Sequence, residues 1–341
     1  PMSILIRNRF QVFTHKPGAL VPLPFSHYAL KIFPTKLLVL DLLQPETVSA
    51  EIDFCQKMPL ENFTVELDLE KGIIACYGTR FKVVFVFDDN KIIVVHKNLN
   101  LNIIKDDLSL ITLSENLPKK TVPPERISFG IFKKPNYNKI EDREDMREIL
   151  PLWHALAKQI PHYEADSSAN TLLSELKEMI VQSQREQVIP LFKALFKTGF
   201  QSMLCPQLYD RLALGYLPPL HAKTPLALIS EGGKLIRSLL FSYTSEHLEF
   251  LPLLPKELAS GRLTGCSLGE SITFQCEWRS KKLLRAFFHS SKDCTLFLSL
   301  PGKVKSYRLQ DLKNKVTMKL NLGEPLLLKE GACLQLDRFI E

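Results

Sequence analysis

Short runs of β-branched and aromatic residues alternate with turn formers from residue 4 to about 133, and this pattern predicts a succession of β-strands. In the run FTVELDL, every second residue from Phe63 to Leu69 is apolar, whereas the residues between them, from Thr64 to Asp68, are polar. One face of this strand should therefore be buried and the other wet. We expect an N-terminal antiparallel β-sandwich within residues 1–138, followed by a proline-containing extended connection over 116–138.

The hydrophobic period changes beyond residue 140. Apolar residues then recur at three- and four-residue steps, which predicts four or five helices between residues 139 and 250. Pro151 and Pro190 are expected in first turns, where a missing N–H costs little. The acidic run at 141–145 is interpreted as stabilising a helix N-terminus, and Gly199 is expected to end one helix.

A two-residue period returns after residue 250. Six runs between 271 and 336 are separated by short polar turns, the spacing of meander hairpins in a small antiparallel β-domain over residues 251–341. The predicted fold class is therefore α+β, mainly β, with a short helical segment between two β-regions.

Composition and charge limit the kinds of partner. The 341 residues carry a net charge of +7, but the Lys and Arg residues are spread along the chain, and no basic run is interleaved with aromatics as nucleic-acid binders require. No apolar run approaches the roughly 20 residues of a membrane span. Seven widely spaced cysteines without a CxxC pair, and no export signal, predict a cytoplasmic protein with reduced thiols. The sequence has no Walker loop, no dinucleotide fingerprint after a strand and no paired metal ligands, so we expect no cofactor and no metal site.

Two segments carry a family resemblance. The segment 249–300 resembles the C-terminal region of family 95 glycoside hydrolases, the inverting α-L-fucosidases, through Leu254-Pro255-Lys256, Ser260-Gly261, Thr264-Gly265, Trp278 and Leu284. The segment 63–96 is similar to the N-terminal domain of the same family through Leu67, Asp68, Leu69, Gly72, Ile73, Phe85, Asp89, Ile93 and Val94. The resemblance implies a β-supersandwich, an (α/α)6 barrel that holds the active site, and a C-terminal β-domain.

The length of the helical region conflicts with a complete barrel. Twelve helices of about 11 residues, joined by loops of about 4 to 6, need on the order of 190 residues. The window from 143 to 250 offers just over half of that. We therefore expect an incomplete α/α barrel.

Inverting glycoside hydrolysis needs one protonated carboxylic acid and one carboxylate base on opposite sides of the sugar. The family's Glu-Trp-rich stretch, which carries the acid, has no counterpart here. The loop before the C-terminal domain matches HAKTPLALISEGG at 221–233, where Glu231 is one candidate carboxylate and, in the alternative interpretation, a charge favourable to the helix dipole. Glu164, in the loop that begins at His162, is the second candidate, with a solvated loop as its alternative.

Four further residues are candidates for carbohydrate binding: Trp153, Tyr163, Tyr216 and His221. The leading hypothesis is a non-catalytic, degenerate relative of fucosidase-like hydrolases that binds a carbohydrate or a protein partner. One alternative is an active glycoside hydrolase with a non-standard site. Another is a structural subunit of a homo-oligomer, whose exposed helical faces are covered by a second copy.

Overall fold

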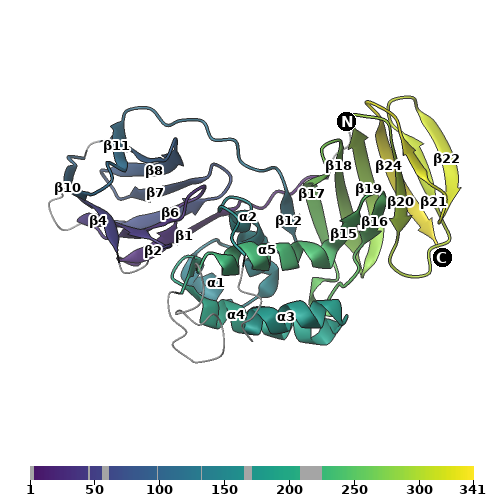
Figure 1. Cartoon of the computed structure of the whole chain (residues 1–341), viewed down its shortest axis with the longest axis horizontal. Coiled ribbons are helices and arrows are strands. Elements are labelled where there is room, and N and C mark those ends of the chain that lie inside the picture. The colour runs from purple at the N-terminus through teal and green to yellow at the C-terminus, as the bar shows by residue number, and fades with distance from the viewer. Residues whose placement is uncertain are drawn as a thin grey trace.

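The computed structural model describes residues 4–44, 47–55, 61–97, 99–131, 133–164, 171–207 and 225–341. Strands make up 42% and helices 20% of the described residues, and the α-helices lie in chain order between two groups of sheets. The predicted α+β, mainly β fold is confirmed. In Figure 1 the N-terminal strands lie at one end of the molecule, the C-terminal strands at the other, and the helices below and between them.

Two sheets that share one hydrophobic core form the N-terminal sandwich. The six-stranded sheet has the order β1-β6-β7-β8-β9-β11, and the five-stranded sheet has the order β10-β5-β4-β3-β2. All pairings are antiparallel except that of β11 with β9, which is parallel. The bounds are β1 (Gln11–Thr14), β2 (Ala19–Pro22), β3 (Tyr28–Ile32), β4 (Lys36–Asp41), β5 (Val48–Asp53), β6 (Thr64–Asp68), β7 (Ile73–Tyr77), β8 (Lys82–Asp88), β9 (Lys91–Lys97), β10 (Asn102–Asp106) and β11 (Ile111–Ser114).

Strand β6 follows its predicted alternation on one face only. The apolar face, from Phe63 to Leu69, is buried as expected. The prediction of a wet opposite face is wrong for Thr64 and Asp68, which are also buried. Strand β1 and the turn that follows it cover them, since Gln11 Nε2 donates to Asp68 at 2.7 Å and the ring of His15 lies 3.0 Å from the Thr64 hydroxyl.

The helical region of the described chain contains the expected number of helices. Two short strands, β13 (Phe200–Gln201) and β14 (Cys205–Pro206), pair within it. Gly199 is the last residue of α4, as predicted. The helices are α1 (Tyr137–Arg143), α2 (Met146–Ala157), α3 (Leu172–Val181), α4 (Arg185–Gly199) and α5 (Ala227–Leu240).

The two helical prolines do not occupy first turns, so that prediction is wrong. Pro151 is the sixth residue of α2, and Pro190 is the sixth residue of α4. Helix α2 begins earlier because Asp145 caps it, its carboxylate accepting from the Arg147 backbone N–H at 3.0 Å. Asp145 alone of the acidic run caps a helix N-terminus, whereas Glu141 and Asp142 lie in the last turn of α1 and Glu144 is its C-cap, so the prediction for the whole run is wrong.

The C-terminal region is built from two further sheets, and a 3₁₀ turn over Lys256–Leu258 precedes its first long strand. The seven-stranded sheet has the order β12-β17-β18-β19-β24-β21-β22, and the four-stranded sheet has the order β15-β16-β20-β23, in which β16 and β20 are parallel. The bounds are β12 (Arg126–Ser128), β15 (Phe241–Thr244), β16 (His247–Phe250), β17 (Gly261–Leu268), β18 (Ile272–Arg279), β19 (Lys282–Ser290), β20 (Cys294–Ser299), β21 (Ser306–Asp311), β22 (Val316–Asn321), β23 (Leu326–Leu328) and β24 (Cys333–Ile340).

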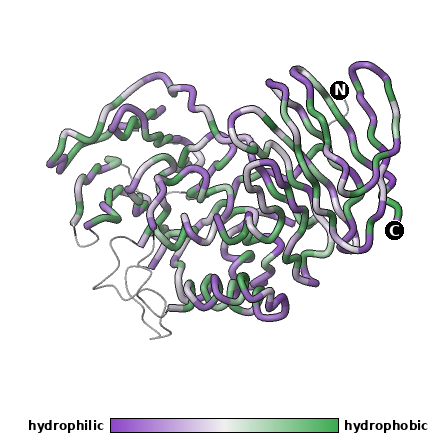
Figure 2. Tube along the Cα trace, turned by 45° about the vertical axis from the view of Figure 1, so that its right-hand side comes forward, coloured by the Kyte–Doolittle hydropathy of each residue, from purple (hydrophilic) through white to green (hydrophobic). Residues whose placement is uncertain are grey.

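Aromatic side chains from both C-terminal sheets meet in their shared core. Phe274 of β18 lies edge-on to Phe241 and Phe250, with ring centroids 4.8 and 5.7 Å apart, and stacks with Phe288 of β19. Figure 2 shows hydrophobic and hydrophilic residues alternating along these strands. The two-residue period of the sequence thus places one face of each strand in the core.

The edge of the seven-stranded sheet comes from the connection that leaves the N-terminal sandwich. Ile127 in β12 pairs with Leu263 in β17, so part of the 116–138 segment is a strand of the C-terminal sheet. The first described residues reach the same sheet, because the Ile4 N–H donates to Gln275 at 2.8 Å. The two β-regions are therefore joined by hydrogen bonds as well as by the helices.

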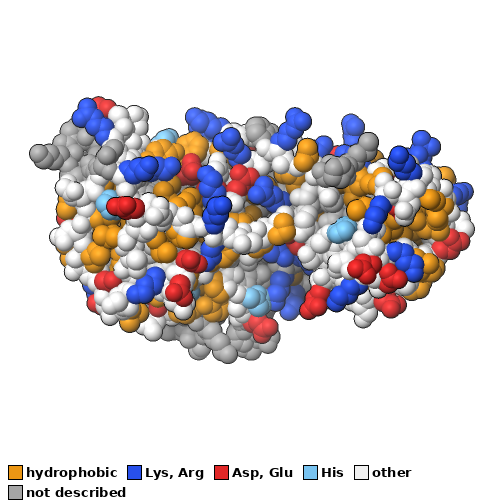
Figure 3. Space-filling view, turned by 90° about the horizontal axis from the view of Figure 1, so that it is seen from above, with side chains coloured by type: hydrophobic (Ala, Val, Ile, Leu, Met, Phe, Trp, Pro, Cys, Tyr) orange, Lys and Arg blue, Asp and Glu red, His pale blue; other side chains and the backbone are white. Residues whose placement is uncertain are grey.

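Basic side chains are scattered over one face of the molecule. On the face seen in Figure 3, Lys and Arg side chains are scattered among acidic and apolar ones rather than gathered into one continuous patch. This distribution agrees with the spacing of basic residues along the sequence.

Candidate functional site

The structure brings the two predicted carboxylate regions close together. The loop at 161–164 lies against the first turns of α5, where the Ser230 hydroxyl accepts from the Tyr163 backbone N–H at 3.2 Å. Next to it, Glu231 and His162 approach each other, with 3.8 Å between Oε1 and Nε2. The sequence named these groups separately, because nothing in it indicated that the loop folds back onto α5.

Glu231 is surrounded by basic groups. Lys234 Nζ lies 3.1 Å from Glu231 Oε1 and 2.7 Å from His162 Nε2, so the three side chains form one polar cluster. The Glu231 side chain is 15% exposed and hence reachable from solvent. Glu164 is exposed on the same loop, and no pairing with Glu231 is found among the described residues.

Tyr163 is half-buried beside this cluster and packs against the hydrophobic core. Burial, with a smaller contribution from the negative charge of Asp41, raises the pKa of the Tyr163 hydroxyl. The phenol therefore stays protonated at neutral pH and can donate a hydrogen bond. A partly exposed ring with a donor at its tip suits contact with a polar ring ligand.

Trp153 occupies the core instead of a binding surface. Its side chain is fully buried in α2, and Nε1 donates to the Ile229 carbonyl of α5 at 3.2 Å. The indole contacts Gly232, where an added Cβ would overlap the ring. At Gly233 an added Cβ would overlap the Cβ of Ala157. The Gly-Gly pair thus permits close packing of α2 on α5, and Trp153 offers no surface to a carbohydrate. The other two sugar-contact candidates, Tyr216 and His221, lie outside the described residues.

A buried charge cluster that the sequence did not indicate lies between the helices and the C-terminal sheet. Glu125, just before β12, is 6% exposed and faces three basic side chains. The closest distances to its oxygens are 3.0 Å for His154 Nε2, 3.3 Å for Lys158 Nζ and 3.0 Å for Arg237 Nε. The His154 nitrogen lies at ion-pair distance but off the direction of a hydrogen bond. Arg237 also donates to the Ser267 carbonyl of β17 at 3.2 Å.

The charges in this cluster decide the ionisation of Glu125. Burial alone would raise its pKa, but His154, Arg237 and Lys158 together outweigh burial and lower the pKa to about 2. A carboxylate that stays ionised and fully engaged at neutral pH is suited to holding elements together and unsuited to donating a proton. Only its position after Pro123-Pro124 marks it in the sequence, and that context indicates a surface connection.

Neither a metal site nor a membrane helix is found in the part of the chain that the structure describes. Those residues contain no group of three or more His, Cys, Asp or Glu side chains able to hold a metal ion. None of their helices is both long enough and apolar enough to cross a membrane.

Comparison with known proteins does not place the chain in a family. No protein-family model matches the sequence, and no curated protein matches it significantly.

Proposed function

We propose that the chain is a non-catalytic relative of fucosidase-like glycoside hydrolases that binds carbohydrate at the cluster formed by His162, Tyr163, Glu231 and Lys234, hereafter the loop–α5 cluster. The observation that carries the proposal is the pairing of Glu231 with Lys234 and His162. These groups offer acceptors and donors for sugar hydroxyls next to a half-exposed tyrosine.

Two points favour binding over hydrolysis. An inverting enzyme places its two carboxyl groups about 6.5 to 9.5 Å apart, on either side of the sugar. The Glu231 side chain contacts the basic groups of His162 and Lys234, and the second candidate, Glu164, is an exposed loop residue. In addition, the helices of the described chain do not close into a barrel that would enclose a substrate.

Calorimetric titration of the full chain with methyl α-L-fucoside and with fucosylated oligosaccharides tests the proposal. We expect binding to the wild type and a loss of about tenfold or more in Glu231→Gln and Tyr163→Ala, because each change removes a group that contacts the sugar. Glu186→Gln, on the exposed first turn of α4, is the matched control and should bind like the wild type.

The same samples decide between binding and catalysis. Incubation with 4-nitrophenyl α-L-fucoside should release no more nitrophenol than buffer alone. Turnover that disappears in Glu231→Gln would instead identify an active hydrolase with a non-standard site. Absence of binding to every glycan would contradict the proposal and leave a protein partner as the better hypothesis.

A further inference from the structure

A cavity of about 260 Å³ lies where two distant parts of the chain meet. The first part leads into β1, and the second runs from β12 through α1 into α2. The cavity shares no lining residue with the loop–α5 cluster. The lining residues that matter here are the apolar Phe10, Val12, Ile127 and Leu152 and the basic Arg9, Lys133, Lys134 and Arg147.

The floor of this cavity is apolar and fixed. Phe10, Val12, Ile127 and Leu152 are each less than 9% exposed and belong to the main hydrophobic core. Side chains packed in this way do not rearrange easily, so the cavity keeps its shape without a ligand. An apolar group placed against this floor would gain free energy by leaving water.

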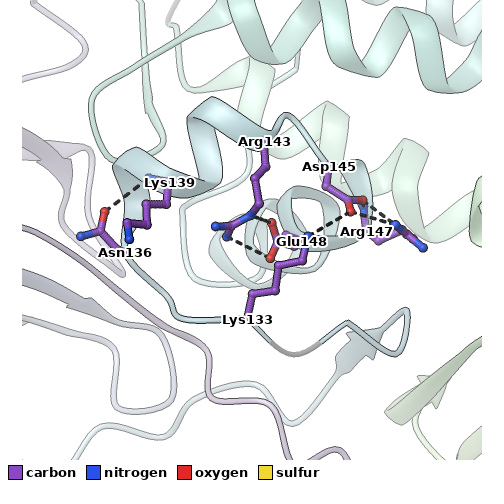
Figure 4. A network of polar contacts seen from close by, with 7 residues as sticks. All are labelled: Lys133, Asn136, Lys139, Arg143, Asp145, Arg147 and Glu148. Carbon is purple, nitrogen blue, oxygen red and sulfur yellow. Dashed lines mark hydrogen bonds and ion pairs between the residues drawn. The ribbon is translucent and has the colours of Figure 1, made fainter.

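The carboxylates beside the cavity are already neutralised. Figure 4 shows the Arg143 guanidinium donating two hydrogen bonds to the Glu148 carboxylate, with lengths of 2.7 and 3.0 Å. The same view shows Arg147 paired with Asp145 at 2.9 Å, and Lys133 lies 3.9 Å from that carboxylate. Neither acidic group is left to repel an anion in the cavity.

Two cations at the cavity have no such partner. Arg9 and Lys134 are exposed, and neither forms an ion pair within the described ranges of the chain. Lys134 Nζ lies only over the ring of Phe13, 5.9 Å from its centroid. The cavity and its immediate ion pairs thus hold five Lys and Arg side chains against two carboxylates, an unbalanced positive charge above an apolar floor.

We propose that this cavity binds a small organic anion, with a carboxylate or phosphate head held by Arg9 and Lys134 and an apolar body on the floor. Guanidinium groups bind both heads through paired N–H donors. Pockets for drug-sized ligands measure about 300 to 1,000 Å³, so a cavity of 260 Å³ fits a body of about one ring. Few unengaged polar groups line the floor, which disfavours an uncharged sugar.

Calorimetric titration of the full chain at low ionic strength tests this assignment with four probes: benzoate, phenyl phosphate, inorganic phosphate and benzyl alcohol. We expect at least one aromatic anion to bind about tenfold more tightly than inorganic phosphate and benzyl alcohol. Only the aromatic anions contact both the basic rim, formed by Arg9 and Lys134, and the apolar floor. Comparison of benzoate with phenyl phosphate then shows which head group the rim prefers.

Two variants locate the site. Arg9→Gln should weaken binding of the preferred anion about fivefold or more, since a charge-assisted contact is lost. Arg7→Gln is the matched control, because Arg7 is also exposed, lies two residues earlier and does not line the cavity. Ile131→Trp, which adds bulk at the cavity wall, should abolish binding while the urea midpoint shows that the chain is folded.

Several results would overturn the assignment. If benzyl alcohol bound as tightly as the aromatic anions, the basic side chains would not contribute to binding. If inorganic phosphate bound as tightly as the aromatic anions, the apolar floor would not contribute. Failure of both aromatic anions to bind would exclude the site, and so would unchanged binding in Arg9→Gln or in folded Ile131→Trp.

Discussion

Replacement of Glu125 by glutamine should destabilise the protein strongly, because Glu125 balances the cations Lys158 and Arg237 and lies 3.0 Å from the buried His154 ring. Its pKa of about 2 lies below the ordinary value of 4.5, and one pKa unit is worth about 1.4 kcal/mol. The ionised form therefore contributes about 3 kcal/mol to the free energy of unfolding at pH 7. Loss of one member of a buried ion pair has a similar cost, about 3 to 5 kcal/mol.

The sign of the pH dependence follows from the lowered pKa. A carboxylate whose folded-state pKa is depressed contributes its full stability above the unfolded value of 4.5 and loses it as the pH falls toward 2. By pH 3.5 the wild type should have lost about 1.4 kcal/mol from this group. The stability difference between wild type and Glu125→Gln should therefore shrink by that amount between pH 7 and pH 3.5.

Urea unfolding at both pH values, followed by tryptophan fluorescence, measures the effect. The two tryptophans report on both sides of the cluster, since Trp153 is in α2 and Trp278 is in β18. Glu51→Gln is the control: Glu51 pairs with Lys36 at 3.1 Å on the surface, where the loss should be below about 1 kcal/mol. Equal unfolding midpoints for wild type and Glu125→Gln at pH 7, or a difference that does not change with pH, would refute the reasoning.

Three further predictions concern packing and thiol reactivity. Gly232→Ala should lower the unfolding free energy by about 1–3 kcal/mol, despite alanine's higher helix propensity, because the new Cβ overlaps Trp153; a stabilised variant in urea titration would contradict this packing. Trp278→Phe removes the 2.9 Å hydrogen bond from Nε1 to the Leu258 carbonyl and should cost about 1–3 kcal/mol, so an unchanged midpoint would argue against that bond. In native protein a disulfide reagent should modify the exposed Cys55 well before buried Cys76, whose pKa burial raises to about 12; peptide mapping that finds Cys76 labelled first would contradict the structure.

The sequence predicted individual helices and strands better than it predicted which elements pack or pair with one another. Alternation identified β6, and Gly199 marked the end of α4, because both depend on local patterns. The burial of Asp68 depends on β1, which lies more than fifty residues earlier, and no local pattern contains that information. The same holds for the parallel pairing of β16 with β20, whose partners are separated by three other strands in the chain.

For the candidate sites as well, the sequence indicated residue types but not their surroundings. Glu231 and Tyr163 were named from residue type and the family resemblance, and the structure places the loop of Tyr163 against the helix turn that carries Glu231. Trp153 was named for its type alone, yet packing against Gly232 determines its role. Glu125 had no signal in the sequence, because its surroundings come from α2 and α5, which follow it in the chain.

The position of β12 affects how the chain reaches its native state during synthesis. A ribosome makes this strand before the helices and long before β17, which must pair with it. The N-terminal sandwich can form as soon as its own strands have emerged from the ribosome. By contrast, β12 can pair with β17 only after more than 120 further residues have been synthesised. We therefore expect a slow final docking step, in which the waiting strand closes the edge of the last sheet, and a nascent chain halted before residue 261 should leave that strand accessible to protease.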